Sequence, residues 1–452
     1  MSTLAFGTAV HDEPIESIDQ LVGLFRSAFK SPAQRKVGLE LEAMPVRADG
    51  SPVPYDAPQG PSIRALLGRL GTVARMRPVL EDGRVIGLEG ASGTCSLEPG
   101  GQVEYSSIPV PTLHELAPLV ETRVRRVREA GSAVGVHWVE QGYQPFARLA
   151  EAQWMPKERY RVMRDYLPGR GRLALRMMTQ TASVQCSFDF TDEADWQRKF
   201  RAAHLLTPLV QAIFANSPFR QGRPSRFLSY RARIWERTDP ERCGLLPAAF
   251  SRDVAIEDYV RYALDVPMMF LIRDGRWVPM RGYSFRRFMQ KGYEGSFATL
   301  EDWGLHLSGI FTHVRLKSYI EVRAHDLVPV ALALAVPALW KGILYDRDAL
   351  EAALALMDGL SVEKATALMA RLARRGLRAR DRGRPLLDLA RELTRIASEG
   401  LRRQRRARRD GRDESLYLEP VESLLARGLT PAEDLLDRYE REWKRNLLGS
   451  II

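Results

Sequence analysis

The stretch SVQCSFDF, residues 183–190, decides which kind of sheet this chain can build. Its even-numbered positions are apolar and its odd-numbered positions are polar. Successive side chains of a strand point to opposite faces, so this strand has one apolar and one polar face. The stretch VRLKSYIEVRAHD, residues 314–326, alternates in the same way and is predicted to be a second such strand. Strands of this kind suit a sheet whose inner surface is a wet active site.

The order of the other elements indicates the fold class. Strands are expected at 36–46, 84–89, 101–106 and 132–139, and helices at 16–30, 62–71, 113–131 and 192–215. From residue 327 onward the chain is predicted to be almost entirely helical, with an amphipathic helix at 386–401. This order favours an α+β fold with an antiparallel sheet over a doubly wound parallel fold. We expect a catalytic α+β core over residues 1–330 and a mostly helical C-terminal part over 331–452 that packs on it.

The composition is that of an ordinary globular protein, with 45% hydrophobic and 27% charged residues among 452. The most apolar stretch, 327–345, contains two prolines and a lysine, and we interpret it as a buried core helix rather than a membrane span. The N-terminal sequence has no secretory signal pattern. Three widely spaced cysteines form neither a zinc pattern nor a disulfide framework, which favours a reducing, cytoplasmic setting.

The net charge of +11 invites a nucleic-acid hypothesis, but the excess is local. Residues 371–412 contain sixteen arginines and five acidic residues, so the rest of the chain is neutral. Arginines on amphipathic helices commonly lie on solvated faces with their stems over apolar surface. Arginine density without aromatic residues gives no base-reading signal. A basic nucleic-acid-binding module is therefore the less favoured alternative.

Two acidic stretches are candidates for a metal site. In GLELE, Glu40 and Glu42 leave the same face of a strand, where like charges repel unless cations lie between them. In SLEPGGQVEYSS, residues 96–107, Glu98 and Glu104 flank a Pro-Gly-Gly turn. Hard cations such as Mg²⁺ prefer carboxylate oxygens and substrate phosphates. A solvated edge strand and an acidic hairpin are the ordinary alternatives.

Basic residues accompany these acids on other predicted strands. In LKSYIEVR, Lys317, Glu321 and Arg323 share one predicted strand face, which places an acid for metal beside cations for phosphate. A cross-strand salt-bridge ladder would give the same pattern. Arg231 and Arg233 are predicted to share another strand face, and arginine can grip a carboxylate with two hydrogen bonds. Repeated polar faces are costly in a core and favour a ligand-filled funnel.

An ordered series of motifs resembles the plant-type glutamate–cysteine ligases, a family that includes bacterial relatives and the γ-glutamylcysteine ligase of ergothioneine biosynthesis. The motifs run from about residue 36 to 443: SLEPGGQVEYSSIPVPTLHEL, MPKERYRVMRDYLP, FANSPFRQGRPSRFLSYRARIW, YALDVPMMF, VRLKSYIEVR and LTPAEDLLDRYEREW. The resemblance implies a glutamine-synthetase-like core, in which a curved antiparallel sheet forms a funnel flanked by helices. It also implies that ATP and Mg²⁺ drive the joining of the γ-carboxyl of L-glutamate to the amine of L-cysteine through γ-glutamyl phosphate.

The resemblance also assigns roles to residues of this sequence. It implies metal binding by Glu40, Glu42, Glu104 and Glu321. It implies contacts of Gln185, Arg323 and Lys317 with the nucleotide phosphates, with Arg323 and Lys317 as the catalytic cations. It implies contacts of Arg231, Arg233 and Glu98 with substrate.

Two departures from the family pattern keep a second hypothesis open. The family usually has Arg-Thr-x-Thr-Val-Gln-Val-Asn before and along the polar strand, whereas this chain has QTASVQCS, with Gln180 for the arginine and Ser187 for the asparagine. After YIEVR the family has Gly-Ala-Asp, and this chain has AHD. A γ-glutamyl ligase with a different acceptor amine is therefore the alternative within the same chemistry. We expect a monomer or homodimer without a membrane partner.

Overall fold

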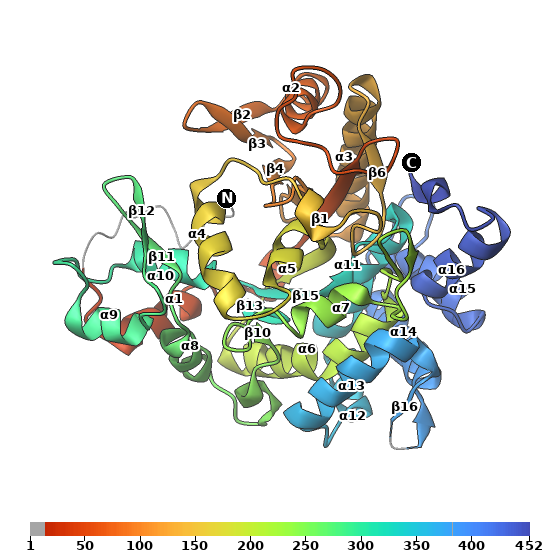
Figure 1. The fold of residues 1–452 in the computed structure, drawn as a ribbon. Coiled ribbons are helices and arrows are strands. Elements are labelled where there is room, and N and C mark those ends of the chain that lie inside the picture. Colours follow the sequence, from red (N-terminus) through yellow and green to blue (C-terminus); the bar gives the residue numbers. More distant parts are fainter. Residues whose placement is uncertain (1–13, 382) are drawn as a thin grey trace.

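The computed structural model describes residues 14–381 and 383–452, and it is built around one large sheet (Figure 1). The strand order is β14–β15–β7–β1–β5–β4–β3–β2, and β6 also pairs with β1. Every pairing in this sheet is antiparallel. Its strands are β1 Val37–Val46, β2 Arg77–Glu81, β3 Arg84–Gly90, β4 Gly93–Leu97, β5 Val103–Ser107, β6 His137–Val139, β7 Ser183–Phe188, β14 Val314–Leu316 and β15 Ile320–Asp326. The predicted α+β class with an antiparallel sheet is confirmed.

Helices cover the apolar face of this sheet, and α3, α6 and α11 contact its central strands. The α-helices are α1 Ile18–Arg26, α2 Ile63–Ala74, α3 Leu113–Ala133, α4 Glu158–Tyr166, α5 Ala174–Gln180, α6 Glu193–Ile213, α7 Tyr230–Trp235, α8 Ile256–Asp265, α9 Phe285–Lys291, α10 Leu300–Leu307, α11 Val330–Leu344, α12 Arg347–Leu356, α13 Val362–Arg375, α14 Leu386–Arg403, α15 Glu419–Ala426 and α16 Pro431–Arg441. Short pairs lie outside the main sheet: β8 Phe219–Arg220 with β9 Arg223–Pro224, β10 Cys243–Gly244 with β13 Phe311–Thr312, β11 Phe270–Arg273 with β12 Arg276–Pro279, and β16 Arg380–Asp381 with β17 Arg384–Pro385.

Local sequence explains where the long helices begin. The Thr112 side chain accepts a hydrogen bond from the Glu115 amide at the start of α3, and Asp192 caps α6 in the same way through Asp195. Such caps satisfy amides that have no partner inside the helix. These caps fix the ends of two helices that pack on the sheet.

Helix α11 confirms the expectation of a buried core helix in 327–345. It packs against β1, β7 and α14, and its residues from Ala333 to Leu344 are buried. Lys341, the one charged residue of this helix, forms a buried ion pair with Glu414. Within residues 14–381 and 383–452, no helix is both long and apolar enough to cross a membrane.

Two predicted strands are wrong in their local structure. Residues 314–326 form the hairpin β14–β15, with Lys317 and Tyr319 in the turn rather than on a continuous strand. Residues 230–235, which contain Arg231 and Arg233, form helix α7, whose N-cap Ser229 accepts from the Ala232 amide. Alternation over a few residues fits several structures, and here the cap and the tertiary contacts decide.

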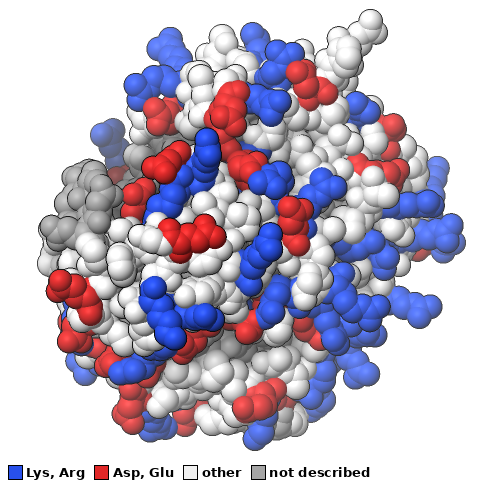
Figure 2. Space-filling model, turned by 60° about the vertical axis from the view of Figure 1, so that its left-hand side comes forward, with Lys and Arg blue, Asp and Glu red and all other residues white. Residues whose placement is uncertain are grey.

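In the described part of the chain, the basic excess of residues 371–412 lies partly on α13 and α14 and partly on the β16–β17 pair and the segment after α14. Arg395 pairs with Glu392 and Glu399, and Arg403 pairs with Asp346. On the face drawn in Figure 2, basic and acidic side chains are interspersed at the centre, and blue side chains prevail toward the right-hand edge. Figure 1 shows the C-terminal helices grouped away from the β2–β3 hairpin.

The predicted domain boundary near residue 330 stays a prediction. The predicted lack of a secretory signal concerns N-terminal residues that lie mostly outside the described ones.

Candidate active site

The polar face of the sheet brings the predicted acidic residues together. Strand register places Glu42 opposite Glu104, Glu40 opposite Gln185, and Glu321 opposite Ser187. Directly opposed residues of antiparallel strands have neighbouring side chains on the same face. Four strands that are far apart in the sequence, β1, β5, β7 and β15, therefore contribute to one polar surface.

Glu321 is the anchor of a cationic cluster on this surface. Its Oε1 accepts from Lys317 Nζ at 2.7 Å, and its Oε2 accepts from Arg315 Nε at 2.5 Å and Arg323 Nη1 at 2.9 Å. Burial opposes ionisation, yet Arg315, Lys317 and Arg323 together hold the pKa of Glu321 well below its usual range. This buried carboxylate fixes three cations, of which Lys317 and Arg323 were predicted to contact phosphate.

For Glu40, Glu42 and Glu104, the surroundings raise the pKa rather than lower it. Burial raises the pKa of Glu40 to about 7, that of Glu42 to about 8 and that of Glu104 to about 7. Neighbouring carboxylates add to each shift: Glu104 acts on both Glu40 and Glu42, and Glu98 acts on Glu104. Nearby lysine and arginine side chains lower these pKa values, but burial and the neighbouring carboxylates outweigh them.

The chemistry of these donors fits a hard divalent cation. Carboxylate oxygens are what Mg²⁺ prefers, and Mg²⁺ usually keeps waters and substrate phosphates as further ligands. Among residues 14–381 and 383–452, no three His, Cys, Asp or Glu side chains are already close enough to hold a metal by themselves.

Gln185 connects the acidic and basic parts of the surface. Its Oε1 accepts from Arg323 Nη1, and its Nε2 donates to Glu42 Oε1 at 3.4 Å. The amide of β7 thus orients an arginine on β15 and a carboxylate on β1. The contact of Gln185 with phosphate stays a prediction.

Glu98 lies at the start of the Pro-Gly-Gly turn, and two cations from another segment face it. Lys157 and Arg159 lower the pKa of Glu98, although burial raises it overall. Lys157 Nζ also donates to the Leu97 carbonyl at 2.9 Å, and Arg159 donates to Ser308. The turn therefore forms a mixed-charge corner of the site.

The turn itself is held by close backbone packing. A Cβ on Gly100 would lie 2.2 Å from the Thr179 carbonyl oxygen, so only glycine fits there. Gln102 Nε2 donates to the Met178 and Thr181 carbonyls, and its Oε1 accepts from the Gly100 amide. These bonds attach the turn to the end of α5, directly before β7.

Of the two arginines expected to bind substrate, the structure brings only Arg231 to the site. Arg231 is buried, donates to the Arg323 carbonyl at 3.0 Å and lowers the pKa of Glu42, although burial raises that pKa overall. Arg233 instead pairs with Glu236 of the adjacent turn at 2.7 Å. The prediction that these arginines share a strand face is wrong, because they lie on helix α7, where side chains two apart point in different directions.

Sequence reasoning missed Arg315, Lys157 and Arg159. Arg315 was recognised only as part of a polar strand face, and its pairing with Glu321 follows from the hairpin register. Lys157 and Arg159 belong to the motif MPKERYRVM, which has no strand-like alternation to reveal its position. Their contact with the Glu98 corner depends on the placement of α4.

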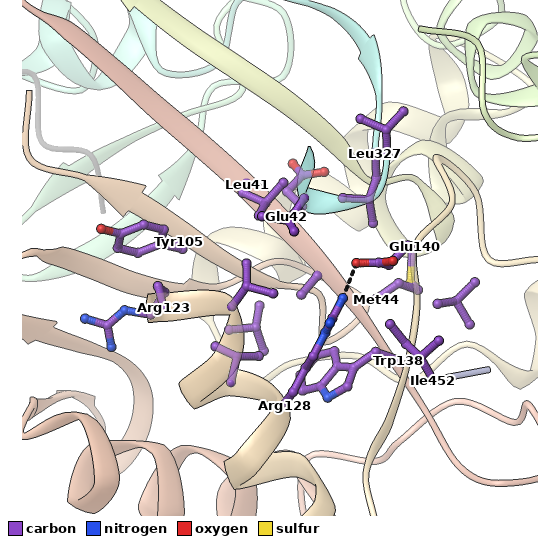
Figure 3. A pocket seen from close by; sticks show the side chains of 17 residues that line it. Leu41, Glu42, Met44, Tyr105, Arg123, Arg128, Trp138, Glu140, Leu327 and Ile452 are labelled. Carbon is purple, nitrogen blue, oxygen red and sulfur yellow. Dashed lines mark hydrogen bonds and ion pairs between the residues drawn. The ribbon is translucent and has the colours of Figure 1, made fainter. Parts of the chain in front are cut away.

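The apolar face of the sheet encloses a separate small cavity of about 50 Å³ between β1, α3 and β6. Met44 and Trp138 line it, and Arg128 closes one side through an ion pair with Glu140 (Figure 3). The Glu42 carboxylate points away from these apolar side chains in the same view. This cavity therefore lies behind the polar surface and is not the candidate site.

The arrangement as a whole combines carboxylates suited to a hard cation with fixed Lys and Arg suited to phosphoryl oxygens. These are the elements of a site for phosphate chemistry assisted by a metal. The chain belongs to glutamate–cysteine ligase family 2 (GCS2), whose family model matches residues 36–450. The resemblance seen in the sequence is confirmed.

Curated relatives and a solved structure agree with this membership. The glutamate–cysteine ligase of Solanum lycopersicum is 38% identical over 96% of this chain and 82% of its own length. Glutamate–cysteine ligase B of Oryza sativa subsp. japonica is 37% identical over 96% of this chain and 86% of its own length. The crystal structure of a glutamate–cysteine ligase from Francisella tularensis in complex with AMP has a TM-score of 0.57 at 13% identity, over 93% of this chain and 88% of that one. The likeness to the solved structure shows the fold.

The expected cytoplasmic setting is contradicted by these relatives, which are named chloroplastic enzymes. The cysteines led to the wrong inference because the number and spacing of thiols report redox conditions rather than a compartment. All three cysteines are free thiols, and Cys95 and Cys186 are buried.

Proposed function

We propose that this protein joins the γ-carboxyl of L-glutamate to the amine of L-cysteine through γ-glutamyl phosphate, with ATP converted to ADP. The product would be γ-glutamylcysteine, for thiol biosynthesis of the glutathione type. The observation that supports this most is the Glu321 cluster, in which one buried carboxylate fixes Arg315, Lys317 and Arg323 beside unpaired acids. Family membership supports the overall reaction.

In the first proposed step, a γ-carboxylate oxygen of glutamate attacks the terminal phosphorus of ATP, and ADP leaves. Lys317 and Arg323 would offset the charge that develops on the transferring phosphoryl group. Gln185 keeps Arg323 in place, and Arg231 is the candidate to bind a substrate carboxylate. The chain's contribution is chiefly positioning and charge neutralisation.

In the second proposed step, the acceptor amine attacks the acyl carbon, loses a proton, and releases inorganic phosphate. Glu98, facing Lys157 and Arg159, would contact the glutamate or the incoming amine. Enclosure against water would protect the acyl phosphate from hydrolysis.

Glu40, Glu42 and Glu104 would hold Mg²⁺. When bound, the ion supplies charge that neutralises the nucleotide phosphates. In this proposal Glu321 serves mainly as the counter-charge of the three cations, because both of its oxygens already accept from them.

A different acceptor amine remains the second candidate, because Ser187 lies on the polar surface opposite Glu321. Gln180, the other altered position in QTASVQCS, is buried and bonds with Tyr143, Arg176 and the Ala147 carbonyl, so it acts on the scaffold. Of the two altered positions in QTASVQCS, Ser187 is therefore the one that lies on the polar surface.

The test is ADP release and product mass with ATP, Mg²⁺, glutamate and a panel of amines. We expect stimulation by cysteine and the mass of γ-glutamylcysteine. A product with another amine in preference to cysteine would establish the second candidate. ADP release that stays at background with every amine would contradict both.

A further inference from the structure

A second charged cavity lies outside the candidate active site. It is a surface cleft of about 600 Å³ formed by the segment before β1, the start of α6, the α11–α12 junction and the end of α14. No side chain assigned above to the polar surface lines it. Its volume is in the range of small-molecule sites.

The cleft is strongly basic. Six cationic residues and two carboxylates line it, and the cations are Arg35, Arg198, Lys341, Arg347, Arg403 and Arg406. Of these, Arg403 pairs with Asp346 and Lys341 pairs with Glu414. Arg35, Arg347 and Arg406 have no carboxylate partner among residues 14–381 and 383–452.

Arg35 is fixed in place rather than freely mobile. Its Nε donates to the Pro32 carbonyl at 3.3 Å, and its guanidinium lies 4.8 Å from the centre of the Tyr345 ring. The Tyr345 hydroxyl donates to the Lys36 carbonyl and accepts from the Asp189 amide, so the ring is attached to the ends of β1 and β7. The two terminal nitrogens of Arg35 remain available to a ligand.

A capped helix terminus also lines the cleft. The first turn of α12, including Arg347 and Leu350, lines the same cleft. The Asp346 carboxylate caps this helix end by accepting from the Ala349 amide at 2.8 Å, so the helix terminus itself offers an anion little. The arginines, rather than the helix end, therefore supply the positive charge of the cleft.

We propose that this cleft binds a small anion that carries at least two phosphoryl groups, at a site separate from the one that performs the ligase reaction. Several arginines around one volume match a multiply charged anion, because each guanidinium can donate two hydrogen bonds to phosphoryl oxygens. The Tyr345 ring is buried beneath Arg35, so the cleft offers no open aromatic surface for a nucleobase. The inference goes beyond the proposed ligase activity and does not depend on it.

The test uses inorganic pyrophosphate as the probe, titrated calorimetrically into the full chain at about 100 mM salt. In the double variant Arg35→Gln/Arg406→Gln we expect at least tenfold weaker binding. The matched control is Arg405→Gln/Arg409→Gln, which removes the same charge from exposed positions of the adjacent segment outside the cleft. Binding by the control should stay within about twofold of the parent protein.

To separate pyrophosphate binding in the cleft from binding at the active site, the same titrations are repeated with Arg323→Gln added to each protein. The loss of affinity caused by Arg35→Gln/Arg406→Gln should be the same with and without Arg323→Gln. Arg406→Gln alone, a change at an exposed position, keeps the test decisive if Arg35→Gln disturbs folding. Equal losses in the two double variants would mean that only net charge matters and would overturn the site. Absence of binding to the parent protein, or equal binding by the cleft variant, would overturn it as well.

Discussion

Two glutamates of the same sheet face, Glu40 and Glu321, differ sharply in their neighbours. Glu321 is surrounded by three cations, whereas Glu40 faces the carboxylate of Glu104 and has no ion pair among the described residues. Removing one partner of a buried ion pair leaves uncompensated charge, but removing one of several like charges relieves repulsion. The two positions should therefore respond to the same substitution with opposite signs.

Glu321→Gln should lower the free energy of unfolding by about 3 kcal/mol or more. Glu40→Gln should leave that free energy unchanged or higher, while turnover falls at least about 100-fold because a proposed metal ligand is lost. Urea unfolding without added metal and an ADP-release assay measure the two effects. Near-normal turnover of Glu40→Gln, or destabilisation of equal size in both variants, would contradict the assignment.

For single residues, the sequence predicted the strand face of the site side chains better than it predicted which other side chains they contact. Glu40, Glu42, Glu104, Gln185 and Glu321 were placed on a common polar face because a strand's period of two is visible in the sequence. Their metal and phosphate roles stay predictions. The contact of Lys157 with the Glu98 corner could not be predicted, because it depends on how a separate helix packs.

Among the structural elements, the Pro-Gly-Gly turn shows most directly how the scaffold determines the site. Gly100 touches the backbone of Thr179, and this contact joins the turn after β4 to the segment before β7. Glu98 and Gln185 lie on either side of this junction. A shift of the turn would therefore move both.

Gly100→Ala should destabilise the protein by roughly 1–3 kcal/mol, because its Cβ would overlap the Thr179 carbonyl. The control is Gly68→Ala in α2, where the added Cβ meets open space. That change should stabilise the protein by about 0.5–1 kcal/mol through helix propensity. Urea unfolding of both variants gives the comparison, and a Gly100→Ala variant as stable as the parent would refute the close packing.

The hairpin β14–β15 and helix α7 show why some elements escaped prediction. Both were assigned as strands from alternating residues over short stretches. Short alternation does not separate a strand from a hairpin or a single helical turn, and the outcome depends on caps and burial. Long elements such as α3, α6 and α11 were found because their apolar pattern extends over many residues.

For the whole molecule, buried histidines connect stability to pH. Burial lowers the pKa of His204 to about 3, that of His325 to about 3 and that of His306 to about 4. The unfolded chain binds a proton at each near pH 6.5, so the folded state binds fewer protons below that pH. Each histidine therefore contributes stability above pH 6.5 that is lost as the pH falls toward 4.

His306→Gln isolates one of these contributions, because glutamine can donate to the Ala263 carbonyl as His306 Nε2 does at 2.7 Å. Between pH 6.5 and 4.5, the free energy of unfolding of this variant should fall less steeply than that of the parent protein. The difference in slope should approach about 1.4 kcal/mol per pH unit, the value for one proton. Identical slopes in urea unfolding would show that this histidine is not held neutral.

The central claim is that the γ-carboxylate of glutamate attacks phosphorus before the amine is joined. Glutamate labelled with ¹⁸O in its γ-carboxyl tests this most directly, with ATP, Mg²⁺ and cysteine, by mass spectrometry of the released nucleotide and phosphate. We expect one ¹⁸O atom in inorganic phosphate for each γ-glutamylcysteine formed, and unlabelled ADP. Label in AMP with release of pyrophosphate, or phosphate without label, would contradict it.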